Sequence, residues 1–182
     1  MVSYISIEVP EMYPYVLGVT GWVTFQCLLV GFASGAKRST IFNKEVMHKN
    51  FGQEHHKYFK TSAPAGGYPD HGNGLYAQKL SYKDWFEFSL DQRAAKNFLE
   101  MTTLLAFSLL CVGLVFPQLA IGLGCAISIL RVLYTMGYKK SPKDRIMLGG
   151  PLLMLSMLVL LLASLYSAFT MIQQLPSGGL IH

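Results

Sequence analysis

Three long stretches of the chain are mostly apolar and contain no charged side chain. They cover residues 12–36, 101–130 and 146–181. Each is longer than the roughly 18 apolar residues that indicate a membrane-spanning helix. The pattern therefore predicts an integral membrane protein whose charged residues all lie outside these stretches.

The second stretch is too long for one span and contains Pro117 near its centre. Phe116-Pro117-Gln118 is typical of a tight turn, which divides the stretch into two helices. The sequence therefore predicts an all-α protein, a four-transmembrane-helix antiparallel bundle in a single membrane domain. The expected spans are about 13–36, 88–116, 118–138 and 142–174, with an extended cytoplasmic loop over 39–84.

The start of the fourth span is predicted from Ser141-Pro142-Lys143-Asp144. A serine followed by a proline, with an acid three residues after the serine, is a helix-start signature. We expect this helix to continue to about residue 174, because Pro176 and the Gly178-Gly179 pair follow it.

Charge predicts the orientation of the bundle. Only 14% of the residues are charged, and all 15 Lys and Arg residues lie between Lys37 and Arg145. In the predicted topology they all fall on one side of the membrane, which the positive-inside rule makes cytoplasmic. Both termini are then expected on the lumenal or external side. The endoplasmic reticulum and the mitochondrial membrane both stay open, because we find no clear retrieval or import signal.

The second span carries a polar face at its cytoplasmic end. Its apolar part, 101–116, is shorter than the ~20 residues that cross a bilayer, so the helix must extend back through polar residues. Arg93, Asn97 and Glu100 recur there at i, i+4 and i+7 and share one helical face. One interpretation is a solvated helix start with an internal Arg–Glu pair. The short apolar part favours the other, a polar pocket at the membrane boundary.

The third span carries a matching stripe. Its apolar part, 118–130, is also too short, so the helix must continue through Arg131, Tyr134 and Tyr138 at i, i+3 and i+7. A tyrosine belt with one snorkelling arginine is the simpler interpretation. Arg131, however, lies about 10 Å deeper than Tyr138, which favours a buried partner. With the basic residues at the ends of the first and fourth spans (Lys37, Arg38 and Arg145), these residues suit a small anionic ligand that also carries an ammonium group.

Two of these segments resemble signatures of a known family. Arg93-Ala94-x-x-Asn97-x-x-Glu100 resembles the RAxxNxxE signature of the MAPEG family, the membrane-associated proteins in eicosanoid and glutathione metabolism. Residues 131–138 resemble the R-x-x-Y-x-x-G-Y segment of the same family. The resemblance is good over residues 85–172 and weak over 13–38.

The resemblance implies a homotrimer of four-helix subunits that binds glutathione in the crevice between neighbouring subunits. It implies that glutathione is held by side chains from the first three spans and that Arg131 supports the pocket. It assigns Arg145 the catalytic role of holding the sulfur as a thiolate, which attacks a lipophilic electrophile or reduces a lipid hydroperoxide. The implied glutathione-binding residues are Arg93, Asn97, Glu100, Tyr134 and Tyr138, with Lys37 or Arg38 at the end of the first span.

The sequence departs from the family pattern at two places. Ala95 stands where relatives usually carry His or Gln, and the 39–84 loop is roughly twenty residues longer than the family's. Its four histidines lack zinc-site spacing, so we expect no metal. The loop is expected to form an extra surface contact or a lid, or to meet membrane lipid through its lysines. The histidines are His48, His55, His56 and His71.

Three functions are therefore weighed. The first is a glutathione-dependent transferase or peroxidase. The second is a lipid-binding activating protein without glutathione chemistry, which the retained Arg93, Glu100 and Arg145 argue against. The third is a non-catalytic accessory subunit of a larger membrane complex, such as a respiratory complex, which the long loop motivates. No nucleic-acid partner is expected.

Overall fold

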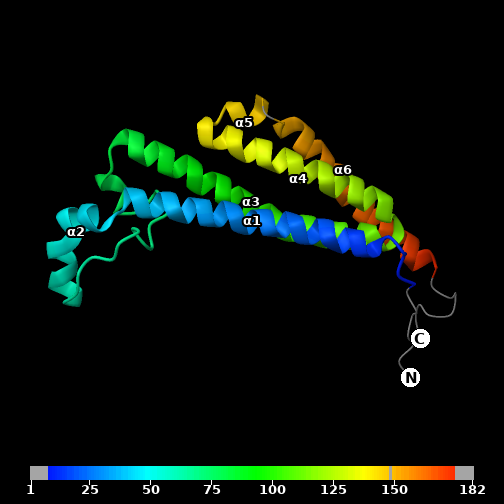
Figure 1. Ribbon diagram of the computed structural model, residues 1–182, viewed down its shortest axis with the longest axis horizontal. Helices are drawn as coiled ribbons and strands as arrows, with labels where there is room; N and C mark the ends of the chain where they lie inside the picture. The colour runs from blue at the N-terminus through cyan, green and yellow to red at the C-terminus, as the bar shows by residue number, and fades with distance from the viewer. Residues whose placement is uncertain (1–7, 148, 175–182) are drawn as a thin grey trace, which may run out of the picture.

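The protein is a bundle of four long antiparallel helices in the computed structural model, which describes residues 8–147 and 149–174 (Figure 1). Within these residues, the four helices are the ones long and apolar enough to cross a membrane, so the chain is an integral membrane protein. The prediction of an all-α bundle of four antiparallel membrane helices is thus confirmed. The helices are α1 (Tyr13–Ile41), α3 (Tyr82–Val115), α4 (Pro117–Lys140) and α6 (Gly150–Gln173).

α3 has the most extensive contacts of the four helices and packs against α1, α4 and α6; α4 also touches the other three. Side chains from all four helices form one apolar core, in which Val23, Leu109, Ile127 and Leu160 are fully buried. The outward faces are also apolar, with large exposed side chains along every helix. A bilayer covers such a surface, whereas a soluble monomer rarely exposes apolar patches of this extent.

Two glycines let α1 lie close to its neighbours. A Cβ atom on Gly113 of α3 would lie 2.6 Å from a methyl carbon of Val16, and one on Gly124 of α4 would lie 2.3 Å from Val19. Both distances are far below a normal carbon contact. The close packing of α1 on α3 and α4 therefore depends on the missing side chains.

The turn between α3 and α4 is formed at Phe116, where α3 ends at Val115 and Pro117 opens α4. At its other end α3 begins at Tyr82, several residues before the expected residue 88. Ser81 caps this end, because its Oγ accepts a hydrogen bond from the backbone N–H of Asp84 at 3.1 Å. The cap explains the longer helix.

The prediction of one continuous helix from residue 142 to 174 was wrong. The Ser141 side chain accepts a hydrogen bond from the N–H of Asp144 at 3.0 Å, but the helix it starts is the four-residue α5 (Asp144–Met147). Gly149 then adopts φ 110°, and α6 begins only at Gly150. The start signature therefore acts on α5, and the left-handed glycine separates α5 from the membrane helix.

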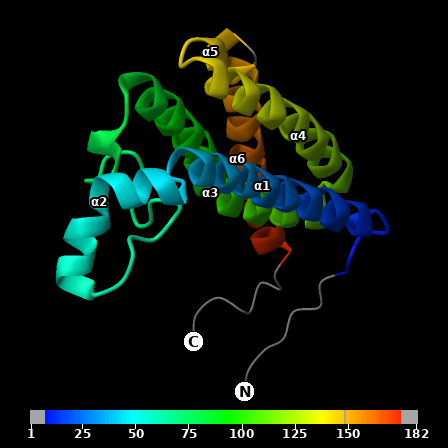
Figure 2. The same ribbon diagram turned by 60° about the vertical axis from the view of Figure 1, so that its left-hand side comes forward.

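The predicted 39–84 loop is largely folded. α1 continues to Ile41, α2 (Lys44–Phe59) follows, and a short 3-10 helix η1 spans Ala77–Lys79. Figure 2 shows α2 beyond the ends of α1 and α3, away from α4 and α6. A second small core holds this inserted segment (residues 42–81) on α3, with its side chains supplied by Phe42, Met47, Phe51, Ala63 and Phe88.

An ion pair fixes how far α3 projects past α4. Asp91 of α3 lies 2.7 Å from the ammonium of Lys139, next to the end of α4. The 24 residues of α4 measure about 36 Å, enough for a hydrocarbon layer of about 30 Å. Residues 82–90 of α3 rise about 13 Å beyond that level. They lie with the inserted segment outside the membrane, on the side where the basic residues gather.

Candidate functional site

Three predicted site residues form a buried stripe on α4. Arg131, Tyr134 and Tyr138 face the interior of the bundle, with exposed fractions of 1%, 6% and 7%. The two tyrosine rings lie with their centroids 5.9 Å apart. The i, i+3, i+7 spacing thus produces the shared face that the sequence predicts, and this face points toward α3, α5 and the start of α6 rather than toward lipid.

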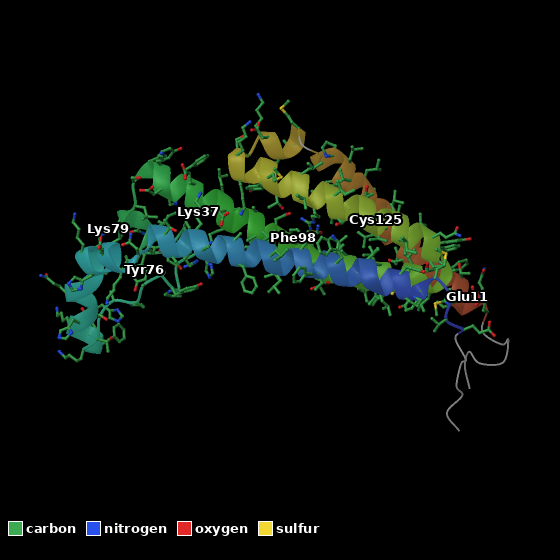
Figure 3. All side chains as sticks on the ribbon, in the orientation of Figure 1. Glu11, Lys37, Tyr76, Lys79, Phe98 and Cys125 are labelled. Atoms are coloured by element: carbon green, nitrogen blue, oxygen red, sulfur yellow. The ribbon has the colours of Figure 1, made fainter. Side chains whose placement is uncertain are left out.

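Arg131 is the deepest cation of this stripe. Its Nη1 donates to the side-chain oxygen of Asn97 at 2.9 Å, and its guanidinium carbon lies 4.8 Å from the ring centroid of Phe98. Phe98 is labelled in Figure 3, about midway along the bundle. The buried Nε and Nη2 have no hydrogen-bond acceptor within the described residues. Buried unpaired donors are costly, so this guanidinium retains capacity for an anionic or carbonyl group, or for water.

Arg145 lies beside the end of the same stripe, in α5. Its guanidinium carbon is 4.9 Å from the ring centroid of Tyr138. Gly137 makes this approach possible, because a Cβ there would lie 2.8 Å from the backbone oxygen of Asp144. The α5 backbone thus packs directly on α4. The structure therefore brings together Asn97, Arg131, Tyr134, Tyr138 and Arg145, which we call the inner stripe.

Arg93 and Glu100 do not join the inner stripe within one chain. Both lie on the exposed side of α3, and Glu100 has an ion pair with Lys96 at 3.9 Å. Glu100 lies about 13 Å below Asp91 along the helix, inside the hydrocarbon layer. Its side chain is 45% exposed there. A carboxylate in contact with lipid is costly, so this face of α3 requires cover from another molecule.

Arg38 has a different partner from the one predicted. Its buried guanidinium donates to the backbone oxygens of Gly66 and Gly67, both at 3.2 Å. Its central carbon lies 4.4 Å from the ring centroid of Tyr68 and 5.2 Å from that of Phe88. The interpretation of Arg38 as a ligand-binding residue therefore needs correction, because its guanidinium holds the inserted segment against α3.

Lys37, the alternative at the end of α1, stays near the surface. It pairs with Glu87 at 3.4 Å, and its side chain is 36% exposed. Figure 3 shows Lys37 and Lys79 toward the end of the molecule opposite Glu11. Of the two basic residues predicted here, Lys37 is the one whose ammonium group remains partly exposed.

Asp70 organises the inserted segment and was missed from the sequence. Its carboxylate accepts hydrogen bonds from the backbone N–H groups of Gly72 (2.7 Å), Gly74 (2.9 Å) and Ala77 (2.7 Å). Burial raises the pKa of Asp70, but these backbone hydrogen bonds outweigh burial, and the net result is a lowered pKa. An aspartate followed by two closely spaced glycines was the available signal.

Two polar interactions inside the bundle were also missed. The first is the Asp91–Lys139 pair. The second joins α1 to α4, where Trp22 donates to the hydroxyl of Ser128 at 3.0 Å and Ser128 donates to Gln26 at 3.1 Å. In the sequence, Asp91 precedes Ala94 by three residues and Phe98 by seven, so it shares a helical face with these two buried residues. That spacing was the available signal for a buried Asp91.

Nothing among the described residues forms a group of three or more His, Cys, Asp or Glu that could hold a metal ion. Two shallow grooves lie on the inserted segment and the start of α3, away from the inner stripe. One is lined by α2 residues between Lys49 and Tyr58, the other by residues between Gly72 and Trp85.

The fold and the inner stripe define a small integral membrane protein with a polar site that contains two arginines, in the half of the four-helix bundle where α4 ends and α6 begins. The MAPEG family model matches residues 14–169, so the chain belongs to the MAPEG family. This family is largely enzymatic and includes glutathione-dependent transferases and peroxidases as well as eicosanoid enzymes. Among curated proteins, none matches the chain.

Proposed function

We propose that this protein is a glutathione-dependent membrane transferase or peroxidase, similar to microsomal glutathione S-transferase type 3 and located in the endoplasmic reticulum or the mitochondrial membrane. Its substrates would be lipophilic electrophiles or lipid hydroperoxides. One observation carries the proposal. Arg145 is held over Tyr138 at the mouth of a buried stripe that contains a second arginine with unpaired donors.

The complete site would form between copies of the chain in a homotrimer. One chain holds the inner stripe, and the exposed Arg93 and Glu100 of α3 need cover from a second molecule. A neighbouring inner stripe beside that face would complete a pocket with opposite charges. In such a pocket, Arg93 would clamp a glutathione carboxylate and Glu100 would receive its ammonium. Asn97 would hold Arg131 in place beneath the tripeptide.

Arg145 would favour the thiolate of glutathione. A free thiol has a pKa of about 8.5, so little of it is ionised at neutral pH. A guanidinium beside the sulfur stabilises the anion and so lowers the pKa of the thiol. Each unit of that decrease corresponds to about 1.4 kcal/mol of stabilisation of the thiolate. In conjugation, the sulfur forms a bond to an electrophilic carbon. It either displaces a leaving group from that carbon or adds to the carbon without displacement. In peroxide reduction, two glutathione molecules give a disulfide while the hydroperoxide gives an alcohol and water.

A thiolate titration tests this role. The absorbance of bound thiolate is followed while glutathione is added to the detergent-purified protein and to Arg145→Ala. Lys143→Ala removes an exposed cation two residues before Arg145 and serves as the matched control. The proposal expects loss of most of the signal in Arg145→Ala and retention in Lys143→Ala. An unchanged signal in Arg145→Ala rejects the role.

A second candidate is a non-catalytic accessory subunit of a larger membrane complex. The folded inserted segment favours it, since Tyr58 and Phe59 at the end of α2 are 66% and 68% exposed. Purification in mild detergent separates the two functions. A free oligomer with conjugating activity supports the enzyme, whereas stoichiometric co-purification with a large assembly and no activity supports the subunit.

A further inference from the structure

Cys27 of α1 lies on the side of that helix that faces the bundle, but the proposed glutathione site does not include it. It follows the fully buried Val23 by four residues and precedes the buried Ser34 by seven, so the three side chains share one face of the helix. The thiol is free and half-buried. Cys27 is therefore a nucleophile at the edge of the core, open in part to molecules in the bilayer.

The packing of α1 on α4 places Cys27 near Arg131. The neighbouring Gln26 accepts a hydrogen bond from Ser128 at 3.1 Å, and Ser128 precedes Arg131 by about one turn of α4. Side chains of a helix lean toward its N-terminus, so the guanidinium of Arg131 reaches back toward the level of Ser128. Cys27 and Tyr134 lie near enough for their charges to act on this guanidinium. A thiol and a buried cation thus meet where α1 crosses α4.

The guanidinium of Arg131 is held in place with donors to spare. Asn97 accepts a hydrogen bond from Nη1 at 2.9 Å, and the ring centroid of Phe98 lies 4.8 Å from the guanidinium carbon. The buried Nε and Nη2 have no acceptor among the residues that the structure describes. These two nitrogens form one edge of the planar group, and such an edge suits an acceptor with two oxygens.

The depth of Cys27 defines the kind of molecule that reaches it. Ser34 accepts a hydrogen bond from Gln92 at 2.7 Å, next to the Asp91 pair at the end of α4. Cys27 lies about 10 Å deeper than Ser34 along α1, inside the hydrocarbon layer. Hydrogen peroxide is polar and enters hydrocarbon poorly, whereas an oxidised acyl chain carries its hydroperoxide within that layer. The position therefore selects a lipid hydroperoxide, whose two oxygens fit the free edge of Arg131.

We propose that Cys27 is a peroxidatic cysteine that reduces lipid hydroperoxides within the membrane while Arg131 holds the hydroperoxide. The sulfur attacks the terminal oxygen, and the oxygen–oxygen bond breaks. The free N–H groups of Arg131 stabilise the negative charge that develops on the leaving oxygen. The thiol proton ends on that oxygen. The lipid is reduced to an alcohol, and Cys27 is oxidised to a sulfenic acid.

Glutathione restores the thiol, and this step alone rests on the proposed function. The glutathione thiol condenses with the sulfenic acid to form a mixed disulfide and water. A second glutathione attacks the mixed disulfide, which releases the Cys27 thiol and glutathione disulfide. Arg131 belongs to the inner stripe and also lies near Cys27, so it links the two sites.

Trapping of the sulfenic acid tests the cysteine directly. The full-length protein in liposomes is treated with linoleic acid hydroperoxide and dimedone, without glutathione, and the adducts are located by peptide mass spectrometry. Cys125 of α4 is the internal control, because it is more exposed than Cys27. Figure 3 shows Cys125 nearer than Phe98 to the Glu11 end of the molecule. Accessibility alone predicts labelling mainly at Cys125. The proposal expects the adduct on Cys27, and equal or greater labelling of Cys125 overturns it.

Two variants test the part of Arg131. Arg131→Met removes the guanidinium, and Arg131→Lys keeps the positive charge but loses the edge with two donors. Labelling of Cys27 should slow on the order of a hundredfold in Arg131→Met, as expected for the loss of donors to a developing oxyanion. It should also slow in Arg131→Lys, while labelling of Cys125 stays at its wild-type rate in both. Wild-type labelling of Cys27 in the two variants overturns the site.

The first step needs no glutathione, so failure of this proposal and failure of the proposed function can be told apart. Cys27 labelling in a protein that does not bind glutathione supports the peroxidatic cysteine and removes the proposed function. Glutathione binding and peroxidase activity without Cys27 labelling remove the peroxidatic cysteine and leave the proposed function intact. If both hold, glutathione added after the hydroperoxide should convert Cys27 to its mixed disulfide.

Discussion

The carboxylate of Asp91 lies 2.7 Å from the ammonium of Lys139 and joins α3 to the end of α4. The carboxylate is almost fully buried, and its second oxygen has no partner within the described residues. The pair joins the two helices at Asp91, so that residues 82–90 of α3 project past the end of α4. It also holds the end of α4, where Tyr138 and Arg145 meet.

Removal of one partner should destabilise the bundle. Lys139→Met leaves the buried carboxylate of Asp91 unpaired. The free energy of unfolding should fall by about 3 kcal/mol. This is the lower end of the range for breaking a buried pair, because Lys139 is partly exposed. The adjacent Lys140→Met is the control, since Lys140 is 78% exposed and its pair with Asp144 spans 3.5 Å. Thermal unfolding in detergent should show a clear loss for Lys139→Met and almost none for Lys140→Met. Equal losses of thermal stability in the two variants would mean that the buried Asp91–Lys139 pair stabilises the bundle no more than the exposed Lys140–Asp144 pair.

Arg38 should control the inserted segment. Arg38→Ala removes two hydrogen bonds from a charged donor to the backbone of Gly66 and Gly67. The local opening free energy should fall by about 3 kcal/mol, which corresponds to tryptic cleavage after Lys60 or Lys79 on the order of a hundredfold faster. Lys37→Ala removes the neighbouring, more exposed cation and should leave cleavage almost unchanged. The same cleavage rate in both variants would contradict the structural role of Arg38.

Asp70 should make the inserted segment sensitive to acid. Its folded pKa lies below the ordinary value of 3.8 because three backbone N–H groups donate to the ionised form. This stabilisation is complete above the ordinary pKa and is lost as the pH falls through the folded pKa. Fluorescence of Trp85 in a Trp22→Phe background should therefore report opening of the segment below pH 3.8.

The control for this acid transition is Asp70→Asn. The amide keeps the shape but lacks the charge, so the segment should be less stable at neutral pH and should lose this acid transition. An identical fluorescence titration in Asp70→Asn would assign the transition to another group.

Gly137 should act through Arg145. A Cβ in Gly137→Ala would lie 2.8 Å from the backbone oxygen of Asp144, so α5 must shift and carry the guanidinium away from Tyr138. Thiolate absorbance should then fall toward the level of Arg145→Ala. Gly122→Ala is a matched control on the same helix, because nothing lies within 4 Å of its added Cβ. A full thiolate signal in Gly137→Ala would show that the position of α5 is unimportant.

The membrane helices were predictable because their signals are local. Long uncharged stretches and the turn at Pro117 specify the bundle within the sequence itself. The break at Gly149 was not predicted, because the start signature at residues 141–144 lies about two turns before Gly150 and indicated a helix that continues through Gly149. The inserted segment was described as a loop because α2 packs its apolar Met47 and Phe51 against Phe88, a partner far along the chain.

The site was predictable where it follows helical spacing and unpredictable where it depends on distant contacts. Arg131, Tyr134 and Tyr138 share a face, as the spacing requires. The contacts of Arg38 were not predictable from the sequence, because Gly66 and Gly67 lie near it only after the inserted segment folds back. Short-range patterns thus identify the cationic character of the site, while folding decides which cations stay available.

The central claim is that the inner stripe of one chain and the exposed Arg93 face of a neighbouring chain together bind glutathione. The most direct measurement is calorimetric titration of glutathione into the purified oligomer, with wild type compared with Arg93→Ala. Lys83→Ala, an exposed cation in the first turn of the same helix, is the control. The account predicts binding at least about tenfold weaker for Arg93→Ala, as expected for loss of a charge-assisted contact, and wild-type affinity for Lys83→Ala. Equal affinity in wild type and Arg93→Ala, or no binding to either, would contradict it.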